Sequence, residues 1–305
     1  MQPHEINGHH VGLVMREACK RAMQHATDRC FEVEAEVKGK KADGRSDWVT
    51  AADRECETIV VGMLREQFPH YGIISEESDL TVPCSIVGED IYFTVDPIDG
   101  TSAYTRKQSH GWGCMISLVR AGEVIAVCIG DANSGEMYYF RPGSDKTHRL
   151  LRRGDHVKEV SLPQLQHRPL FEQAVLLRDL PKDHGLQTQV VIKSPHWAKI
   201  LIADGSIGLS MARLWKGEVG ACILKGRKKT PWDDTPVIGM TLRLGFIFLQ
   251  IELEENAGTM CRLRQMMPKP PRVEGPQPYS FLVIHKDQLP SVRKFCHDFS
   301  FSLEA

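Results

Sequence analysis

Two stretches near the N-terminus carry apolar residues at helical spacing. Between residues 11 and 30 apolar positions recur every three or four residues, and a second stripe runs from Cys56 to Leu64. This period is typical of amphipathic helices, so we expect one helix ending near Cys30 and another ending near Phe68. Thr50 and Asp53, just before the second stripe, predict a capping box at the start of that helix.

Short apolar runs separated by turn residues predict strands in the next part of the chain. These runs are residues 71–75, 91–95, 113–118, 124–129 and 137–140. Strands of this kind favour an antiparallel sheet, which the two helices would cover. Residues 148–153 fit a short strand and a helical turn equally well, and we leave their structure open.

Helix and strand patterns alternate in the second half of the chain. The expected strands are residues 190–192, 219–224, 246–249 and 279–284; the expected helices cover residues 196–203, 205–217 and 233–244 and the C-terminus. A stretch rich in charge, proline and histidine separates the two halves. We therefore expect an N-terminal α+β domain, residues 1–155, and a C-terminal α/β domain, residues 156–305.

Composition narrows the class of protein. A net charge of −1 argues against non-specific binding of nucleic acid, and no apolar run approaches the roughly 20 residues that span a bilayer. The N-terminus lacks the basic-then-apolar order of a secretory signal. The nine cysteines show no C-x-x-C spacing, which favours reduced thiols. We expect a cytoplasmic protein without nucleic-acid or membrane partners; a homodimer stays open.

The segment Asp96-Pro97-Ile98-Asp99-Gly100-Thr101 follows one of the expected strands directly. Its two carboxylates are three residues apart, and Pro97 stiffens the turn between them. The backbone carbonyl of Ile98 adds a third oxygen donor. Hard divalent cations such as Mg²⁺ take oxygen ligands of this kind. An ordinary turn is the alternative for this pattern taken alone.

Two further acidic segments occur at comparable positions. Glu76 and Glu77 follow the strand expected at residues 71–75, and Trp232-Asp233 opens a helical pattern late in the chain. Together with the hexapeptide, and in this order, they resemble the metal-dependent, lithium-sensitive phosphomonoesterases typified by inositol monophosphatase. The resemblance extends from the first helix to the last strand. It implies a layered αβαβα sandwich of the inositol monophosphatase/fructose-1,6-bisphosphatase type, a mixed α+β and α/β fold.

The resemblance also implies an activity, the hydrolysis of a small phosphate monoester by metal-activated water. The cofactor it implies is Mg²⁺, roughly two or three ions. The implied metal ligands are Glu76, Asp96, the Ile98 carbonyl, Asp99 and Asp233. Glu76 and Thr101 would hold the attacking water together, and Thr101 could pass its hydroxyl proton to Asp53. Most of these residues lie in the N-terminal domain, whereas Asp233 comes from the C-terminal one.

A second group of residues is expected to bind the phosphate or the rest of the substrate. Gly100, Thr101 and Ser102 open a helix, where free backbone amides attract anions. Ser206, Arg227 and Lys228 are further candidates. The basic runs 38–46 and 225–229 each fit a solvated loop as well as a substrate-facing one. In the second interpretation, Lys40 or Lys41 sits on a lid over the site.

Two departures from the family pattern put inositol in doubt as the substrate. The family commonly has an aspartate and a glutamate where this chain has Gly220 and Leu224. Its Glu-Ala-Gly-Gly segment is replaced by Arg243-Leu244-Gly245. The alternatives are a 3′(2′),5′-bisphosphate nucleotidase, a fructose-1,6-bisphosphatase, a histidinol-phosphatase or a catalytically silent binding protein.

Overall fold

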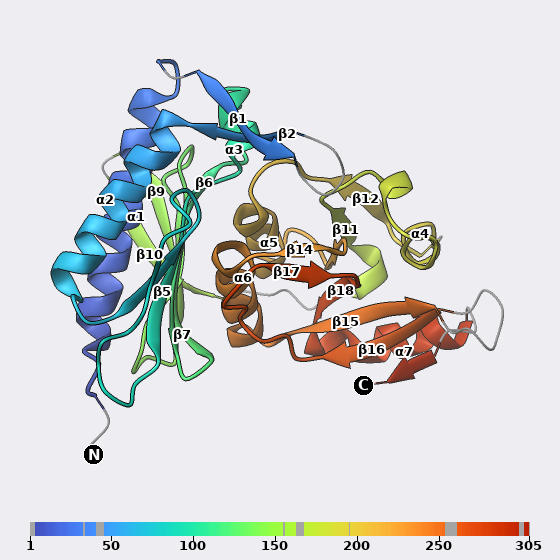
Figure 1. Ribbon diagram of the computed structural model, residues 1–305. Helices are drawn as coiled ribbons and strands as arrows, with labels where there is room; N and C mark the ends of the chain where they lie inside the picture. The colour runs from blue at the N-terminus through green and yellow to red at the C-terminus, as the bar shows by residue number, and fades with distance from the viewer. Residues whose placement is uncertain are drawn as a thin grey trace.

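The computed structural model describes residues 4–32, 34–40, 46–154, 156–162, 168–194, 196–253, 261–298 and 302–304. Two β-sheets and their helices form alternating layers (Figure 1). The expected α+β and α/β layered fold is therefore confirmed. Lys41 of the expected lid lies outside the described residues, as does the side chain of Lys40.

The outer layer of the first half consists of α1 (Gly8–Arg29) and α2 (Ala51–Gln67), the two helices that the apolar stripes predict. They pack on one face of the first sheet, with Met15, Cys56 and Leu64 in the shared core. Both bonds of the predicted capping box are present. The Asp53 amide donates to Thr50 Oγ1 at 3.4 Å, and the Thr50 amide donates to Asp53 Oδ2 at 2.7 Å.

The first sheet has eight strands in the order β10-β9-β8-β7-β6-β5-β3-β4. Their bounds are β3 (Gly72–Ser75), β4 (Thr81–Val82), β5 (Ile91–Asp99), β6 (Gly113–Arg120), β7 (Glu123–Asp131), β8 (Met137–Phe140), β9 (Thr147–Arg153) and β10 (His156–Leu162). The pairs are antiparallel except for β3 and β5, which are parallel. The undecided stretch 148–153 is a strand. The sheet extends to Leu162, and the division at residue 155 stays a prediction.

Helices α5 (Ile207–Trp215) and α6 (Pro231–Arg243) lie between the two sheets (Figure 1). Their apolar side chains join a core that receives Ile129 from the first sheet and Phe248 from the second. Trp215 is fully buried there and donates its indole N–H to Thr241 Oγ1 at 3.2 Å. This middle layer fixes how the two halves of the chain meet.

The second sheet has seven strands in the order β12-β11-β13-β18-β15-β16-β19. Their bounds are β11 (Ala174–Leu177), β12 (Lys199–Ile202), β13 (Ala221–Leu224), β15 (Phe246–Leu253), β16 (Cys261–Met266), β18 (Ser280–His285) and β19 (Ser302–Glu304). Strands β12, β11 and β13 are mutually parallel. Helices α4 (Leu186–Ile192) and α7 (Leu289–Asp298) cover the outer face.

Short elements connect these layers. They are β1 (Ala35–Lys40) paired with β2 (Ser46–Thr50), β14 (Arg227–Lys229) paired with β17 (Gly275–Gln277), α3 (Thr101–Thr105), and the 3₁₀ turns η1 (Leu170–Glu172), η2 (Pro181–Asp183) and η3 (Lys286–Gln288). Parts of both basic runs, expected in loops, therefore lie in strands. Among the described helices, none is long and apolar enough to cross a membrane. All nine cysteines are free thiols.

Two expectations for the second half are wrong. Residues 190–192 belong to α4 and not to a strand, and residues 199–202 form β12 and not a helix. The pairing of β12 with β11 is parallel and joins segments about 25 residues apart, so local periodicity does not reveal it. For residues 190–192, a contact with a later residue supports the helix: the indole N–H of Trp197 donates to the Val191 carbonyl at 2.9 Å and holds the end of α4.

Candidate metal centre

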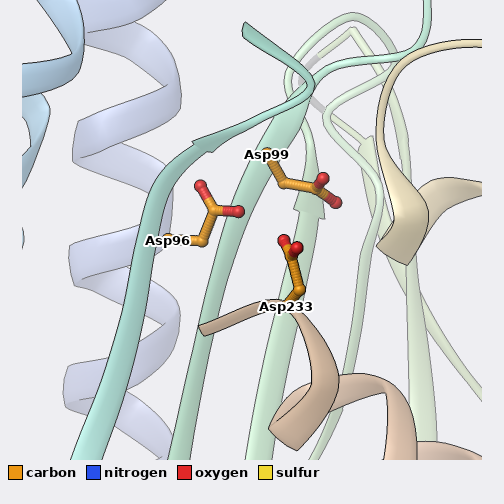
Figure 2. Close-up of side chains that lie close together, drawn as sticks. All are labelled: Asp96, Asp99 and Asp233. Carbon is orange, nitrogen blue, oxygen red and sulfur yellow. The ribbon is translucent and has the colours of Figure 1, made fainter. Parts of the chain in front are cut away.

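Three carboxylates converge where the first sheet meets the middle layer of helices (Figure 2). Asp96 and Asp99 lie at the end of β5, and Asp233 lies in the first turn of α6. One oxygen of each carboxylate lies within 4.8 Å of the others. Asp96 is only 2% exposed and Asp99 only 5%. The three residues are thus brought together from positions up to 137 apart in the chain (233 minus 96).

The local sequence explains how β5 presents two carboxylates. The β5–β6 ladder shifts register between Asp96 and Asp99, where Pro97 has no amide hydrogen to donate. On the α6 side, Pro231 occupies the first helical position, which suits its fixed φ. Trp232 is buried against Tyr92 and other apolar residues of the first sheet. Its packing holds Asp233 beside the end of β5.

The negative charge of Asp96 is the least compensated of the three. Burial raises the pKa of Asp96 well above its ordinary value, and the neighbouring charges of Glu76, Asp99 and Asp233 add to the effect. Asp96 Oδ1 is buried without a hydrogen-bond partner in the described part of the chain. Buried carboxylates carry a large desolvation cost unless something pairs with them. This donor set of hard oxygen atoms fits a divalent cation such as Mg²⁺.

Glu76 and Glu77 belong to the same electrostatic cluster. Burial and then the charges of Glu77 and Asp233 raise the pKa of Glu76 well above its ordinary value. Burial, followed by the charge of Asp53, raises the pKa of Glu77 to about 7. Lys38 on β1 opposes both shifts, with its Nζ 3.1 Å from Glu77 Oε2. One lysine of the first basic run therefore faces the acids from β1.

Glu57, in α2, supports the segment that carries these two acids, a role that the sequence analysis missed. Its Oε1 accepts hydrogen bonds from the Ser75 hydroxyl and from the amides of Glu77, at 3.1 Å, and Ser78, at 3.3 Å. The side chain is buried. The signal was available, because Glu57 lies four residues after Asp53 on the buried face of the helix.

Asp53 and Thr101 form a second polar unit beside the acids. The Thr101 hydroxyl lies 3.2 Å from Asp53 Oδ1 and 3.2 Å from the Ile98 carbonyl oxygen. Asp53 is fully buried, and burial raises its pKa although the hydrogen bonds from Thr50 act in the opposite direction. A hydroxyl with a carboxylate acceptor is able to relay a proton.

The expected phosphate-binding residues occupy two neighbouring turns. Gly100 has φ 98° and precedes α3, which is only five residues long, and Ser102 is half-buried. The Ser206 hydroxyl donates to Asp99 Oδ2, and the amides of Ile207 and Gly208 donate to the same carboxylate. In the structure Ser206 therefore contacts a candidate metal ligand.

Arg227 also contacts the candidate centre directly. Its guanidinium donates to Asp233 Oδ2 at 2.9 Å and to Asp234 Oδ1 at 2.8 Å. Burial alone would raise the pKa of Asp233, but Arg227 outweighs it, with the Thr230 hydroxyl, and the pKa is lowered. Lys228 pairs instead with Glu274 at the surface. Of these two candidate substrate-binding cations, the structure therefore places one beside the centre and the other at the surface.

Comparison with known proteins identifies the family. The model of the inositol monophosphatase family matches residues 9–238. The chain belongs to that family. It is 24% identical to the inositol-1-monophosphatase of Bacillus subtilis over 212 residues, 68% of this chain and 74% of that protein. It is 29% identical to the Nus factor SuhB of Vibrio cholerae over 103 residues, which cover 33% of this chain and only 36% of the relative.

A solved structure shares the fold. The crystal structure of an IMPase/NADP phosphatase complexed with Mg²⁺ and phosphate is similar with a TM-score of 0.62, over 93% of this chain and 94% of that one. The two sequences are 18% identical. At this identity the similarity shows the fold of the family member and nothing about its substrate.

Proposed function

We propose that this member of the inositol monophosphatase family hydrolyses small phosphate monoesters with the help of bound Mg²⁺. The observation that carries the proposal is the convergence of the Asp96, Asp99 and Asp233 carboxylates within 4.8 Å of one another. Acids at this separation, two of them buried, repel one another, so a fold that brings them together gains from a divalent cation between them. A cytoplasmic location and a small phosphorylated substrate are part of the proposal.

Residues of this chain would hold the cation and manage the proton. Asp96, Asp99, Asp233 and Glu76 are the proposed ligands, with the Ile98 carbonyl. A bound divalent cation would lower the pKa of a water molecule and neutralise charge on the leaving oxygen. Thr101 and Glu76 orient the attacking water, and Asp53 accepts the proton that the Thr101 hydroxyl passes on. The 3.2 Å separation of Thr101 Oγ1 and Asp53 Oδ1 supports this relay.

Release of inorganic phosphate tests the proposal. Inositol 1-phosphate and other monoesters are incubated with the protein, with Mg²⁺ and with excess chelator. Asp96→Asn should lower Mg²⁺-dependent kcat/KM by at least about a hundredfold, because metal catalysis contributes several kcal/mol. Without Mg²⁺ the variant should be at least as stable as wild type, since it removes a repelling charge. Asp145→Asn, at an exposed position, is the matched control. Near wild-type turnover of the Asp96 variant would refute the assignment.

One observation favours a second candidate, a catalytically silent binding protein. Arg227 occupies the Asp233 carboxylate at 2.9 Å and would compete with a cation for it. The two candidates differ in a single pair of measurements. The first measures Mg²⁺ binding by calorimetry, and the second measures phosphate release. An enzyme should show both Mg²⁺ binding and turnover. Weak Mg²⁺ binding without turnover on any phosphate ester supports the silent protein.

A further inference from the structure

Arg178 stands at the carboxyl end of a parallel part of the second sheet. It directly follows β11, which lies between β12 and β13 and runs parallel to both. Ligands of open parallel sheets bind in the crevice outside the carboxyl ends of the strands. The segment after β12 leads to Ser206, which contacts Asp99. The carboxyl end of β11 therefore faces the same region as the candidate metal centre.

The contacts of Arg178 leave part of its guanidinium available. One terminal nitrogen donates to the Gly205 carbonyl, next to Ser206. The Nε atom is buried and has no hydrogen-bond partner in the described part of the chain. The positive charge of Arg178 also acts on the candidate metal centre. Burial raises the pKa of Asp99, whereas the charge of Arg178 lowers it. A guanidinium carries five N–H donors in a planar fork, so several remain for a ligand.

The end of β13, which lies beside Arg178, carries no acid that could pair with this cation. In the β11–β13 register Leu177 pairs with Ile223, which sets Arg178 beside Leu224. Leu224 is 8% exposed, and the residue after it is Lys225. The acid next in sequence, Asp179, lies beside the buried imidazole of His184. The crevice between β11 and β13 is thus cationic and apolar, and on the β12 side Asp204 is paired with Arg106. This environment suits an anion better than a sugar hydroxyl.

We propose that Arg178 is a specificity-determining residue that binds a second anionic group, a carboxylate or phosphate, of the phosphate monoester. The scissile phosphate would lie at the divalent cation that the three aspartates would hold, and the second anion would extend toward the end of β11. The proposal rests on the proposed function, since it names the substrate class of the same site. It accounts for Leu224, because a glutamate there would neutralise Arg178.

Matched substrates that differ in one charged group test the proposal. The short pair is 2-phosphoglycerate and glycerol 2-phosphate, in which a hydroxymethyl group replaces the carboxylate. The long pair is adenosine 3′,5′-bisphosphate and adenosine 3′-monophosphate. Wild type should prefer the charged member of at least one pair by roughly tenfold or more in kcat/KM. Arg178→Met should abolish this preference by raising KM for the charged member. The kcat/KM for the neutral member should stay unchanged. Arg178→Lys should retain part of the preference.

Arg293→Met, at an exposed position on α7, is the matched control and should behave like wild type. Arg178 could instead act structurally, through its hydrogen bond to the Gly205 carbonyl beside Ser206. A changed apparent Mg²⁺ affinity of the Arg178 variants would report such a role. An equal loss on both members of each pair, or a weakened Mg²⁺ affinity that accounts for the loss, would overturn the proposal. Wild type that hydrolyses these esters without a charge preference would overturn it too, while the proposed function stands. If wild type releases no phosphate from any ester, the proposed function itself fails.

Discussion

The hydroxyl of Ser206 donates a hydrogen bond to the carboxylate of Asp99, a residue 107 positions earlier in the chain. The amides of Ile207 and Gly208 donate to the same carboxylate at 3.0 and 2.9 Å. The backbone of Asp99 ends β5, and its carboxylate lies against the N-terminus of α5, where the helix dipole favours a negative charge. The two halves of the molecule are therefore joined at a residue of the candidate metal centre.

Gly100 makes this junction possible, and replacing it should be costly. A Cβ at Gly100 would lie 2.3 Å from the Gly111 carbonyl oxygen and 2.8 Å from the Ser206 amide. Gly122 has a similar φ of 80° but nothing within 4 Å of its Cβ position, so Gly122→Ala isolates the backbone cost. By chemical denaturation we expect losses of about 1 kcal/mol for Gly122→Ala and about 3 kcal/mol or more for Gly100→Ala. Equal losses would contradict the steric argument.

Glu57→Ala should weaken the site from a distance. The substitution leaves the Ser75 hydroxyl and the amides of Glu77 and Ser78 without their acceptor. We expect a stability loss of about 2 kcal/mol and an apparent Mg²⁺ affinity roughly tenfold weaker, measured by denaturation and calorimetry. The control is Glu55→Ala on the same helix, whose ion pairs with His25 and Arg29 are partly exposed and contribute little. Unchanged Mg²⁺ affinity in the Glu57 variant would show that Glu57 does not support the site.

Arg227→Met should tighten Mg²⁺ binding. The wild-type guanidinium holds Asp233 and Asp234, and a divalent cation must compete with it for the first carboxylate. Removing the competitor also leaves two unpaired negative charges, the buried one of Asp234 and the half-buried one of Asp233, which a cation would stabilise. Calorimetry should show an affinity several-fold higher than wild type, with Lys228→Met, which breaks only the surface pair with Glu274, as the control. Weaker binding in the Arg227 variant would mean that Arg227 supports the site.

The buried imidazole of His184 predicts a pH dependence of stability. Burial lowers its pKa, against the opposing charges of Asp179 and Asp183, and Lys225 lowers it further. The unfolded chain therefore binds a proton near the ordinary histidine value while the folded chain does not. Stability is complete above that value and falls as the pH drops toward the folded pKa. Between pH 7 and pH 5, wild type should lose more stability than His184→Gln, whereas a variant of the exposed His156 should follow wild type. Parallel curves for wild type and His184→Gln would contradict this expectation.

The sequence by itself determined the features that depend on neighbouring residues. The apolar stripes predicted α1 and α2, because helical periodicity needs no distant partner. The capping box of Thr50 and Asp53 was readable for the same reason. The turn at Asp96–Thr101 was also local, since its proline and glycine set the backbone directly. These segments carried the family resemblance, and the family is confirmed.

The tertiary structure alone decided the features that depend on pairing across the chain. Residues 190–192 contain β-branched side chains that favour a strand, yet they belong to α4, which buries Val191 and Ile192 against the second sheet. Residues 199–202 became β12 only through parallel pairing with β11, which the sequence analysis had not recognised. Without β11, the position of Arg178 was also hidden, and nothing local marked the partners of Arg227. Charged side chains acquire their roles from what the fold places opposite them, because electrostatic and hydrogen-bond energies depend on distance in space and not along the chain.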